Sequence, residues 1–315
     1  MDNNYVGNYV LLEEIDCGSF GCVYLVRHRF LTNRFAAMKL LDSTRLRFGP
    51  DRNRFLREAE FLSVLNHPFI LSIYDAGIDE VTNIPYIVTE YAPGGSLRSL
   101  LRQHPHRPLA IGNAIAILTQ VGEALHYAHQ QNILHHDIKP ENILFNAEGE
   151  ALLADFGIAM MLQSEVGTRP TASIGTPAYM APEQFRGYAS RRSDQYSLAC
   201  VAYELVTGRP PFSANNHVEM GLKHLQQRPV PPSRLNPHVP VYVEQAILTA
   251  MEKRRINRFA DVLQFIEALQ GIAPDQSPEP SISRPILLRG GKTKAQWLQD
   301  NAIVRYLKRF LATWL

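Results

Sequence analysis

The sequence of 315 residues contains few cysteines, no long apolar run and little net charge, and each shortage excludes a class of protein. Its three cysteines, Cys17, Cys22 and Cys200, are too few for a disulfide-rich scaffold, show no metal-ligand spacing and indicate a reducing compartment. No stretch approaches the roughly eighteen apolar residues of a membrane-spanning helix, and the polar residues 1–9 lack the apolar segment of a signal peptide. A net charge of +2 gives no overall electrostatic case for binding nucleic acid. We therefore expect a cytoplasmic protein with no nucleic-acid partner.

The first part of the sequence has the texture of a β-sheet. Hydrophobic residues make up 45% of the chain and charged residues 20%, as in ordinary globular proteins. Up to about residue 90, short apolar runs alternate with polar breaks and predict strands, interrupted by one segment with helical periodicity. The predicted strands are Tyr9–Ile15, Cys22–Arg29, Phe35–Leu41, Ile70–Tyr74 and Tyr86–Glu90, and the predicted helix is Asp51–Leu65.

Beyond a Pro-Gly hinge at Ala92–Gly95, the pattern changes to helices. Ile111–His129 carries an apolar stripe, and Asp194–Val206 is apolar on nearly every side, which requires burial. The sequence therefore predicts an α+β fold with two lobes. One is a β-rich N-terminal lobe with one main helix, at about 9–90, and the other is a mostly helical C-terminal lobe, at about 91–270.

The end of the sequence differs from the rest in charge. Residues 271–295 are rich in Pro, Ser and Gly and predict a linker. Residues 281–315 contain seven Lys or Arg against one acid, Asp300, a net charge of +6 that leaves −4 for the rest of the chain. Apolar residues recur at helical spacing over 296–315, which predicts a basic amphipathic helix. Such a helix either contacts the anionic inner face of a membrane or mediates docking or self-association, and we favour the latter.

The candidate catalytic residues lie in two short polar runs, each next to an apolar β-type segment. Asp137, Lys139 and Asn142 fall within six residues, and Asp155 follows eighteen residues after Asp137. This set fits the transfer of a phosphoryl group from a metal-bound nucleotide to a hydroxyl, a reaction that depends on positioning and charge neutralisation. We predict that Asp137 deprotonates the hydroxyl and that Lys139 neutralises phosphate charge. Asn142 and Asp155 would hold Mg²⁺, which prefers oxygen ligands. The alternative is a pair of polar loops without chemistry.

A glycine-rich hairpin predicts the phosphate-binding part of a nucleotide site. Glycines allow backbone N–H groups to approach phosphate oxygens, although an ordinary hairpin is the alternative. The predicted nucleotide-binding residues of the hairpin are Ile15, Asp16, Cys17, Gly18, Ser19, Phe20, Gly21 and Val23. On the next strand Ala37 and Lys39 share one face, so a small residue can flank a base while the ammonium reaches the phosphates. Glu58 is the expected partner of Lys39, in preference to the acid two positions further on, which lies some 200° around the helix.

Taken in order, these motifs resemble the eukaryotic-type protein kinases over about residues 9–270. The resemblance rests on the glycine hairpin, Ala37-Met38-Lys39, Glu58, the loop around Asp137, Asp155-Phe156-Gly157 and Ala181-Pro182-Glu183. Lys139 and the segment Gly175–Tyr179 are similar to the serine/threonine branch of the family. The segment Ser193–Ala199 is similar to the bacterial Hanks-type kinases.

The resemblance implies a bilobal enzyme that uses ATP and Mg²⁺ to phosphorylate Ser and Thr residues of protein substrates and of itself. It also implies further roles: Thr89 behind the adenine, backbone groups of Glu90 and Ala92 on the base edge, Val23 over the base, Thr176 near Asp137, Asp194 bracing the catalytic loop, and Arg258 paired with Glu183. The contending interpretations are a pseudokinase or nucleotide-binding scaffold and a small-molecule phosphotransferase. Because no catalytic residue is lost, we favour the active protein kinase.

Three details near the predicted site bear on its function. Asp16 stands where the family has its first glycine, which predicts weaker nucleotide binding.

His136 stands where an arginine usually precedes the catalytic Asp, and an imidazole cannot form the bidentate contact of a guanidinium with a phosphate. We therefore predict that activity depends only weakly on phosphorylation of the activation segment; the alternative is that His136 merely fills space. Cys17 and Cys22 flank the site, and we expect inert thiols in preference to a redox role.

Overall fold

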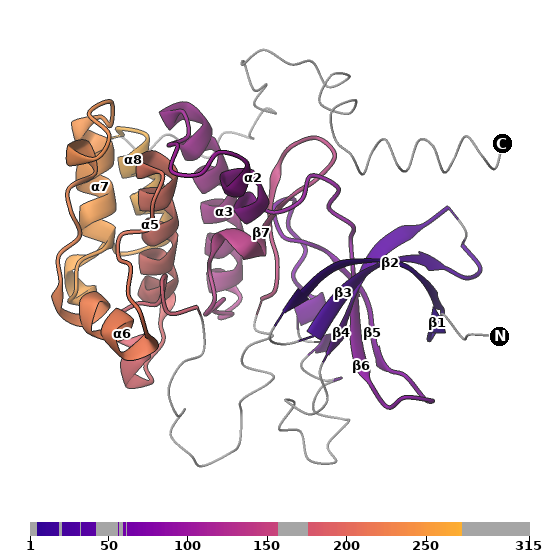
Figure 1. The fold of residues 1–315 in the computed structure, drawn as a ribbon. Coiled ribbons are helices and arrows are strands. Elements are labelled where there is room, and N and C mark those ends of the chain that lie inside the picture. Colours follow the sequence, from indigo (N-terminus) through magenta and orange to yellow (C-terminus); the bar gives the residue numbers. More distant parts are fainter. Residues whose placement is uncertain are drawn as a thin grey trace.

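The computed structural model of the chain describes residues 5–18, 21–31, 33–41, 56, 59–60, 62–156 and 176–272. Its N-terminal part is a β-sheet and its C-terminal part is mostly helical, and the two parts meet at β7 (Figure 1). The two-lobe architecture predicted from the sequence is therefore confirmed. The predicted linker and terminal helix lie outside the described residues from 273 onward. In the described parts of the chain, no helix combines the length and apolar character needed to cross a bilayer.

The N-terminal sheet has six strands, and neighbouring strands pair antiparallel in the order β1-β2-β3-β4-β6-β5. The strands are β1 (Tyr5–Val6), β2 (Tyr9–Gly18), β3 (Gly21–His28), β4 (Phe35–Leu41), β5 (Ile73–Ile78) and β6 (Pro85–Thr89). The prediction for Phe35–Leu41 matches β4 residue for residue. Of the predicted helix at 51–65, residues 56, 59–60 and 62–65 are described, and 56, 59–60 and 62–63 among them are helical; the predicted role of Glu58 falls outside the described residues.

The alternation of side chains along the strands separates a packed face from a half-buried face. Ala36 and Met38 on β4 are buried in a small cluster with Val26 and Val88, which are their neighbours in the sheet register. Ala37 and Lys39, which alternate with them, lie on the opposite face and are half-buried. The cluster holds the sheet together, and the other face is left for the site.

The prediction of a strand at Ile70–Tyr74 was wrong by about three residues. The strand that pairs with β6 begins at Ile73 and continues to Ile78. Ile70 instead forms an isolated parallel bridge with Leu153, and Leu71 N–H donates to the Leu153 carbonyl at 3.0 Å. The first residues of this apolar run therefore contact β8 of the helical part, and the residues from Ile73 onward pair with β6 of the sheet.

The C-terminal part contains six described α-helices, four 3₁₀ turns and one two-stranded sheet. The helices are α2 (Leu97–Gln103), α3 (Ile111–Gln130), α5 (Arg191–Thr207), α6 (His217–Gln226), α7 (Val241–Ala250) and α8 (Val262–Leu269). The 3₁₀ turns are Pro140–Asn142, Gln184–Arg186, Pro232–Arg234 and Arg255–Asn257. The sheet pairs β7 (Ile143–Phe145) with β8 (Ala151–Leu153).

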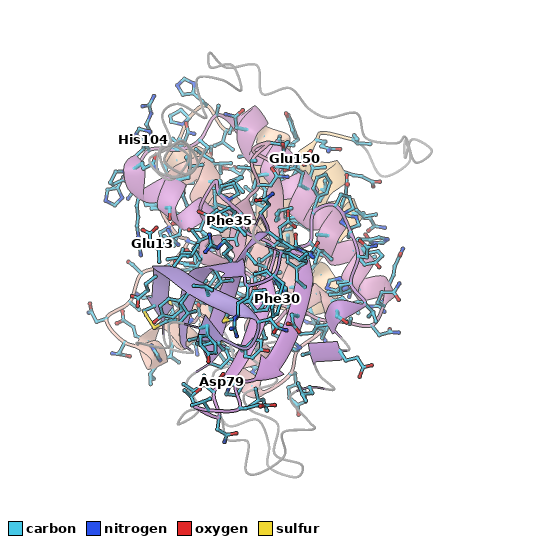
Figure 2. The ribbon with its side chains drawn as sticks, turned by 90° about the vertical axis from the view of Figure 1, so that its right-hand side faces the viewer. Glu13, Phe30, Phe35, Asp79, His104 and Glu150 are labelled. Carbon is cyan, nitrogen blue, oxygen red and sulfur yellow. A yellow bond between two sulfur atoms is a disulfide. The ribbon has the colours of Figure 1, made fainter. Side chains whose placement is uncertain are left out.

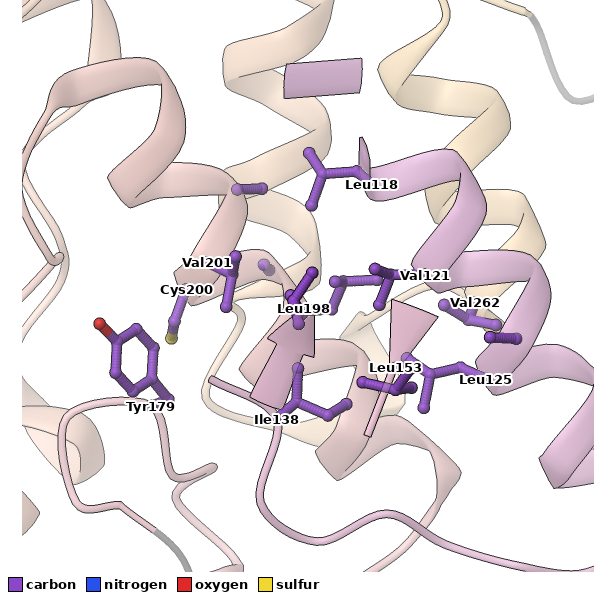
Figure 3. Packing of buried hydrophobic residues seen from close by; sticks show 14 of the residues in the cluster. Leu118, Val121, Leu125, Ile138, Leu153, Tyr179, Leu198, Cys200, Val201 and Val262 are labelled. Carbon is purple, nitrogen blue, oxygen red and sulfur yellow. The ribbon is translucent and has the colours of Figure 1, made fainter. Parts of the chain in front are cut away.

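Helix α5 forms the centre of this part. All its residues from Ser193 to Thr207 are buried, as the apolar pattern of the sequence predicts for a helix surrounded by others. Leu198 and Val201 of α5 pack in one cluster with Leu118 and Val121 of α3 (Figure 3). This core supports the loops that precede β7 and follow β8.

Candidate active site

The hairpin of β7 and β8 explains why the two candidate metal ligands come together. Asn142 directly precedes β7, and only Ala154 separates Asp155 from the end of β8. The register pairs Ile143 with Leu153. The start of one antiparallel strand lies beside the end of the other, so the two side chains belong to the same end of the hairpin. The Ala154 N–H donates to the Asn142 carbonyl at 2.9 Å and closes this end.

Asp137 lies in the loop between α3 and β7, and each of its carboxylate oxygens has partners. Lys139 Nζ is 2.6 Å from Oδ2, and the Thr176 N–H donates to Oδ1 at 2.8 Å. Asn142 Nδ2 donates to the Asp137 carbonyl at 2.8 Å and to Oδ2 at 3.3 Å. Burial alone would raise the pKa of this carboxyl, but the Lys139 ammonium and the Thr176 N–H outweigh burial and hold the pKa below its usual value. The side chain is therefore an anion although only 9% of the residue is exposed.

Asp194 of α5 holds the backbone of the catalytic loop from beneath. Its Oδ2 accepts hydrogen bonds from the His135 N–H at 3.0 Å and from His129 Nε2 at 2.8 Å, and its Oδ1 accepts one from the His136 N–H at 3.0 Å. Asp194 as a whole is 2% exposed. Burial would raise its pKa, but the hydrogen bond and charge of His129 outweigh burial and lower it. His136 itself has a positive φ of 71°, which these hydrogen bonds stabilise.

Lys39 connects the sheet to the second polar run. Its Nζ lies 2.6 Å from Asp155 Oδ2, and the two side chains are 16% and 35% exposed. The sequence predicts the two residues as parts of one site but does not predict this direct ion pair, because 116 residues separate them. The neighbouring Phe156 is buried and its ring lies 4.7 Å from the His135 ring, so the run after β8 packs against the catalytic loop.

The residues predicted to contact a nucleotide base share the half-buried face of the sheet. The register pairs Val23 with Lys39, and Ala37 with Thr89. Directly paired residues point to the same side of a sheet, so these four side chains lie on one face. The structure thus brings together residues from β3, β4 and β6 beside the ion pair of Lys39.

The hinge after β6 presents backbone groups next to this face. The Glu90 N–H donates to the Ser72 carbonyl at 2.8 Å, and the Glu90 carbonyl accepts a hydrogen bond from Thr89 Oγ1 at 3.2 Å. The Ala92 carbonyl accepts one from the Gly95 N–H at 3.4 Å. Among the described residues, no acceptor is found for the Ala92 N–H. That donor is therefore available to a base edge.

The glycine hairpin is formed by the ends of β2 and β3. Gly18 pairs with Gly21, and Asp16 pairs with Val23, so the Asp16 carboxylate lies on the same face as Lys39. Its neighbours Ile15 and Cys17 are exposed. The predicted positions Ser19 and Phe20 lie outside the described residues.

The two described glycines of the hairpin differ in their surroundings. A Cβ placed on Gly18 would meet nothing within 4 Å. A Cβ on Gly21 would lie 1.9 Å from the Leu40 carbonyl oxygen, and Gly21 has a φ of +134°. Gly21 is therefore required by the sheet itself, while the space above Gly18 is open to a ligand.

The prediction of inert thiols at Cys17 and Cys22 was wrong. The two residues are direct partners in the β2–β3 register, and their sulfur atoms form a disulfide (Figure 2, where disulfides are drawn as yellow bonds). The cysteine content therefore no longer indicates a reducing compartment. The only group of three potential metal ligands among the described residues is Glu14 with these two cysteines. Because its two sulfurs are bonded to each other, neither is the thiolate that binds metals.

Glu183 and Arg258 form the ion pair expected from the sequence. Arg258 Nη1 lies 2.7 Å from Oε1 of Glu183, and Nη2 donates to Oε2 at 2.8 Å. Arg258 is buried, and a second donor, Ser193 Oγ, reaches Glu183 Oε1 at 2.8 Å. Burial would raise the pKa of Glu183, but the contacts with Arg258 outweigh burial and lower it. This pair fixes the segment after Tyr179 against α5.

A further charged cluster beside the catalytic loop is missed by the sequence reasoning. Arg98 of α2 donates to Glu141 Oε1 at 2.7 Å and to Glu204 Oε1 at 2.7 Å, and it also donates to the Tyr179 hydroxyl. The Tyr179 hydroxyl donates to Glu204 Oε2 at 2.6 Å. One guanidinium therefore links the catalytic loop, α5 and the segment that follows Thr176. No local sequence pattern predicts this cluster, because its members lie up to 106 residues apart.

The residues present fit a magnesium nucleotide. Asn142 uses its amide nitrogen for Asp137, which leaves the amide oxygen to a metal, and Asp155 supplies a carboxylate. These are hard oxygen ligands of the kind that Mg²⁺ prefers. The Lys39 ammonium and the open face of Gly18 suit the phosphates, and the Ala92 N–H, which has no acceptor among the described residues, suits a base.

Comparisons with known proteins agree with this chemistry. The sequence matches the family model of the protein kinase domain over residues 9–269. It is 38% identical over 277 residues to the serine/threonine-protein kinase PknB of Mycolicibacterium smegmatis, covering 85% of this chain and 44% of that protein. It is 40% identical over 254 residues to the serine/threonine-protein kinase PrkC of Bacillus subtilis, covering 80% of this chain and 38% of that protein. The chain thus spans about two fifths of the length of these relatives.

The fold is also similar to solved structures. The crystal structure of the Mycobacterium tuberculosis PknI kinase domain superimposes with a TM-score of 0.68 at 28% sequence identity. The match covers 86% of this chain and 98% of that chain.

Proposed function

This chain belongs to the protein kinase family as a relative of bacterial serine/threonine kinases, and on that premise we propose that it is an active enzyme. It transfers the γ-phosphate of ATP to Ser and Thr hydroxyls of protein substrates, and to hydroxyls of its own chain. The observation that carries the proposal is the buried Asp137 carboxylate, which stays ionised beside Lys139 at 2.6 Å.

Each polar group of the site has a task in this reaction. Asp137 orients the substrate hydroxyl and accepts its proton while the oxygen forms a bond to the γ-phosphorus and the bond to the β-phosphate oxygen breaks. Lys139 and Lys39 neutralise charge on the transferred group and on the remaining phosphates. Asn142 and Asp155 would hold Mg²⁺, which when bound would neutralise charge on the phosphate oxygens. The hairpin residues, Ala37 and the hinge bind the nucleotide.

Substitution of the base tests this proposal most simply. With labelled ATP, Mg²⁺ and a protein substrate, Asp137→Asn should lose about 10²-fold or more of the phosphotransfer rate of the full chain, because an amide cannot accept the proton. Asp261→Asn is the matched control: it makes the same change at the N-cap of α8, where Asn caps as well as Asp. Absence of labelled protein with the wild type would favour the alternative, a nucleotide-binding scaffold.

We also propose that phosphorylation of the activation segment has little influence on activity. His136 stands beside the base, and burial lowers its pKa while Asp194 opposes this, so the imidazole is neutral at pH 7. A neutral ring lacks the charge and the fork with which an arginine pairs with a phosphate. Alanine at Ser164, Thr168, Thr171 and Ser173 together should therefore retain most of the activity, whereas its abolition in a folded protein would refute the proposal.

Two further proposals concern the location of the kinase in the cell and the role of its C-terminal segment. The kinase acts in the cytoplasm, and the basic segment 296–315 docks onto the kinase or another copy of it in preference to a membrane. Sedimentation with anionic liposomes, comparing the full chain with one that ends at Gln270, separates the two roles. Co-sedimentation of the full chain alone would assign the segment to the membrane surface.

A further inference from the structure

The disulfide Cys17–Cys22 lies where the sheet has the least other support. Two register shifts interrupt the pairing of β2 with β3, between Leu11 and Glu13 and between Glu14 and Asp16. Such bulges remove ladder hydrogen bonds. From Leu12 to Gly18 every residue of β2 is exposed, so no core contact fixes the end of this strand.

The partner strand is held much better. At Gly21 the strand β3 has neighbours on both sides, Gly18 of β2 and Leu41 of β4. Through its register with β4 it is tied to the buried cluster that contains Met38. The disulfide therefore fastens the weakly supported end of β2 to a strand that is already anchored.

The disulfide does not obstruct the nucleotide site. Val23 pairs with Lys39 and shares its face, whereas Cys22, one residue earlier, points to the other side of the sheet. Cys17 is the direct partner of Cys22 and lies on that same outer side. The covalent link thus restrains the backbone of Gly18 while the face toward Lys39 stays open.

The link is also within reach of solvent reagents. Cys17 is exposed and Cys22 is half-buried. The third cysteine, Cys200 of α5, is 0% exposed and lies in the hydrophobic core around that helix (Figure 3). Burial raises the pKa of its thiol well above the usual value. Accessible thiols react and buried protonated thiols do not, so a redox response would belong to the hairpin pair alone.

We propose that Cys17 and Cys22 form a reversible redox site that sets nucleotide affinity: the disulfide pre-orders the phosphate-binding hairpin, and reduction loosens it. This inference rests on the proposed function, because it assigns the hairpin to ATP. Restraining a loop in its bound conformation lowers the entropy lost on binding. The oxidised protein therefore binds MgATP more tightly than the reduced protein.

The chemistry of the switch is balanced with two co-reactants. In oxidation by a peroxide, one cysteine thiolate attacks a peroxide oxygen and becomes a sulfenic acid with loss of water. The second thiol then displaces a second water and the S–S bond forms; both sulfurs are oxidised and the peroxide is reduced. In the reverse direction a dithiol attacks one sulfur, forms a mixed disulfide and releases both cysteines as thiols while it becomes a disulfide itself.

The test is calorimetric titration of the full chain with MgATP after treatment with hydrogen peroxide or with dithiothreitol. Mass spectrometry of peptides establishes the state of Cys17 and Cys22 in each sample. We expect the dissociation constant to be about five-fold lower in the oxidised sample. The double variant Cys17→Ser/Cys22→Ser should show the affinity of the reduced form under both treatments. Cys200→Ala is the matched control and should retain the redox response.

Each other outcome has a defined meaning. Equal affinities in the two states, with phosphotransfer intact, would overturn the redox inference and leave the proposed function standing. A tighter reduced form, a response that persists in the double variant, or free thiols after peroxide treatment would overturn it as well. Absence of nucleotide binding in both states would overturn the proposed function, and the inference with it.

Discussion

The loop around Asp137 and the glycine hairpin, which we propose form one site, are held in different ways. Asp137 contacts Lys139 and Asn142 of its own loop and the Thr176 N–H of a distant segment, and its loop is held by the buried Asp194. The hairpin has an exposed β2 end, two bulges and one covalent link. In the proposed function, the chemistry therefore rests on residues held by many contacts, and nucleotide binding on a hairpin held by few. Substitutions on the two sides should separate stability from nucleotide affinity.

The largest change in stability is expected when the buried ion pair between Arg258 and Glu183 is broken. This pair belongs to the catalytic side of the site, by which we mean the loop around Asp137 and the helical part that supports it. Arg258→Ala leaves the Glu183 carboxylate buried without its main partner, which should cost about 3–5 kcal/mol in the free energy of unfolding. Lys223→Ala is the matched control, because it breaks the surface pair with Glu219 at 2.8 Å and should change the free energy of unfolding far less than Arg258→Ala. Urea unfolding of both variants measures the difference. Equal losses would mean that the catalytic side does not depend on buried charge.

A second effect, smaller than the first, concerns the stability of the same side in acid. His224 is buried between the Tyr196 hydroxyl, at 2.9 Å, and the Ala178 carbonyl, at 3.1 Å. Burial, assisted by the nearby Lys253 ammonium, lowers its pKa to about 3. The unfolded chain takes up a proton near pH 6.5 and the folded chain does not, so stability falls as the pH drops below 6.5. Between pH 7 and 5 this group should cost about 2 kcal/mol.

The measurement compares urea unfolding at the two pH values. His224→Gln should lose that part of the pH dependence, whereas His217→Gln, an exposed position on the same helix, should keep it. The lowered pKa values of Asp137, Asp194 and Glu183 act in another window: their stabilisation is present above the unfolded pKa near 4 and is lost only below it. An identical pH dependence in wild type and His224→Gln would contradict the assignment.

On the hairpin side, the two glycines should respond differently to the same change. Gly21→Ala places a Cβ against the Leu40 carbonyl at a positive φ, and should destabilise the protein by about 1–3 kcal/mol. Gly18→Ala has room for the Cβ and should change stability by no more than about 0.5 kcal/mol, while it weakens MgATP binding by crowding the phosphates. Thermal unfolding and calorimetric titration of both variants test this. A stability loss at Gly18 as large as that at Gly21 would remove the distinction.

The smallest effect is expected at Asp16. Its carboxylate lies on the face of Lys39, where it would repel the phosphate oxygens of a bound nucleotide through solvent. Asp16→Gly should tighten MgATP binding by about three-fold, since a surface charge contributes on the order of 0.5–1 kcal/mol. An unchanged dissociation constant would show that the hairpin does not bring this residue near the phosphates.

The sequence predicts the elements well where the pattern is local. The alternation over Phe35–Leu41 and the all-round apolar character of Asp194–Val206 correspond to β4 and to the buried part of α5. The predicted strand begins at Ile70, three residues before the observed start at Ile73. Ile70 is apolar for another reason, which is its bridge to the distant Leu153. Periodicity cannot distinguish between the two partners of such a run.

Contacts within the site were harder to predict than the residues that form it. The ion pair of Lys39 with Asp155 and the cluster of Arg98 join segments far apart in sequence, and only the packed fold brings them together. The disulfide left a local signal that was not used. Cys17 and Cys22 stand next to Gly18 and Gly21, which pair directly, and this symmetry makes the two cysteines direct partners in the antiparallel pairing of β2 with β3.

The most direct test of the account measures turnover and MgATP affinity together in Asp137→Asn. If the catalytic side performs the chemistry and the hairpin side binds the nucleotide, phosphotransfer should fall by about 10²-fold or more while the dissociation constant of MgATP changes by less than about two-fold. A loss of nucleotide affinity in proportion to the loss of turnover would contradict the division between the two sides of the site.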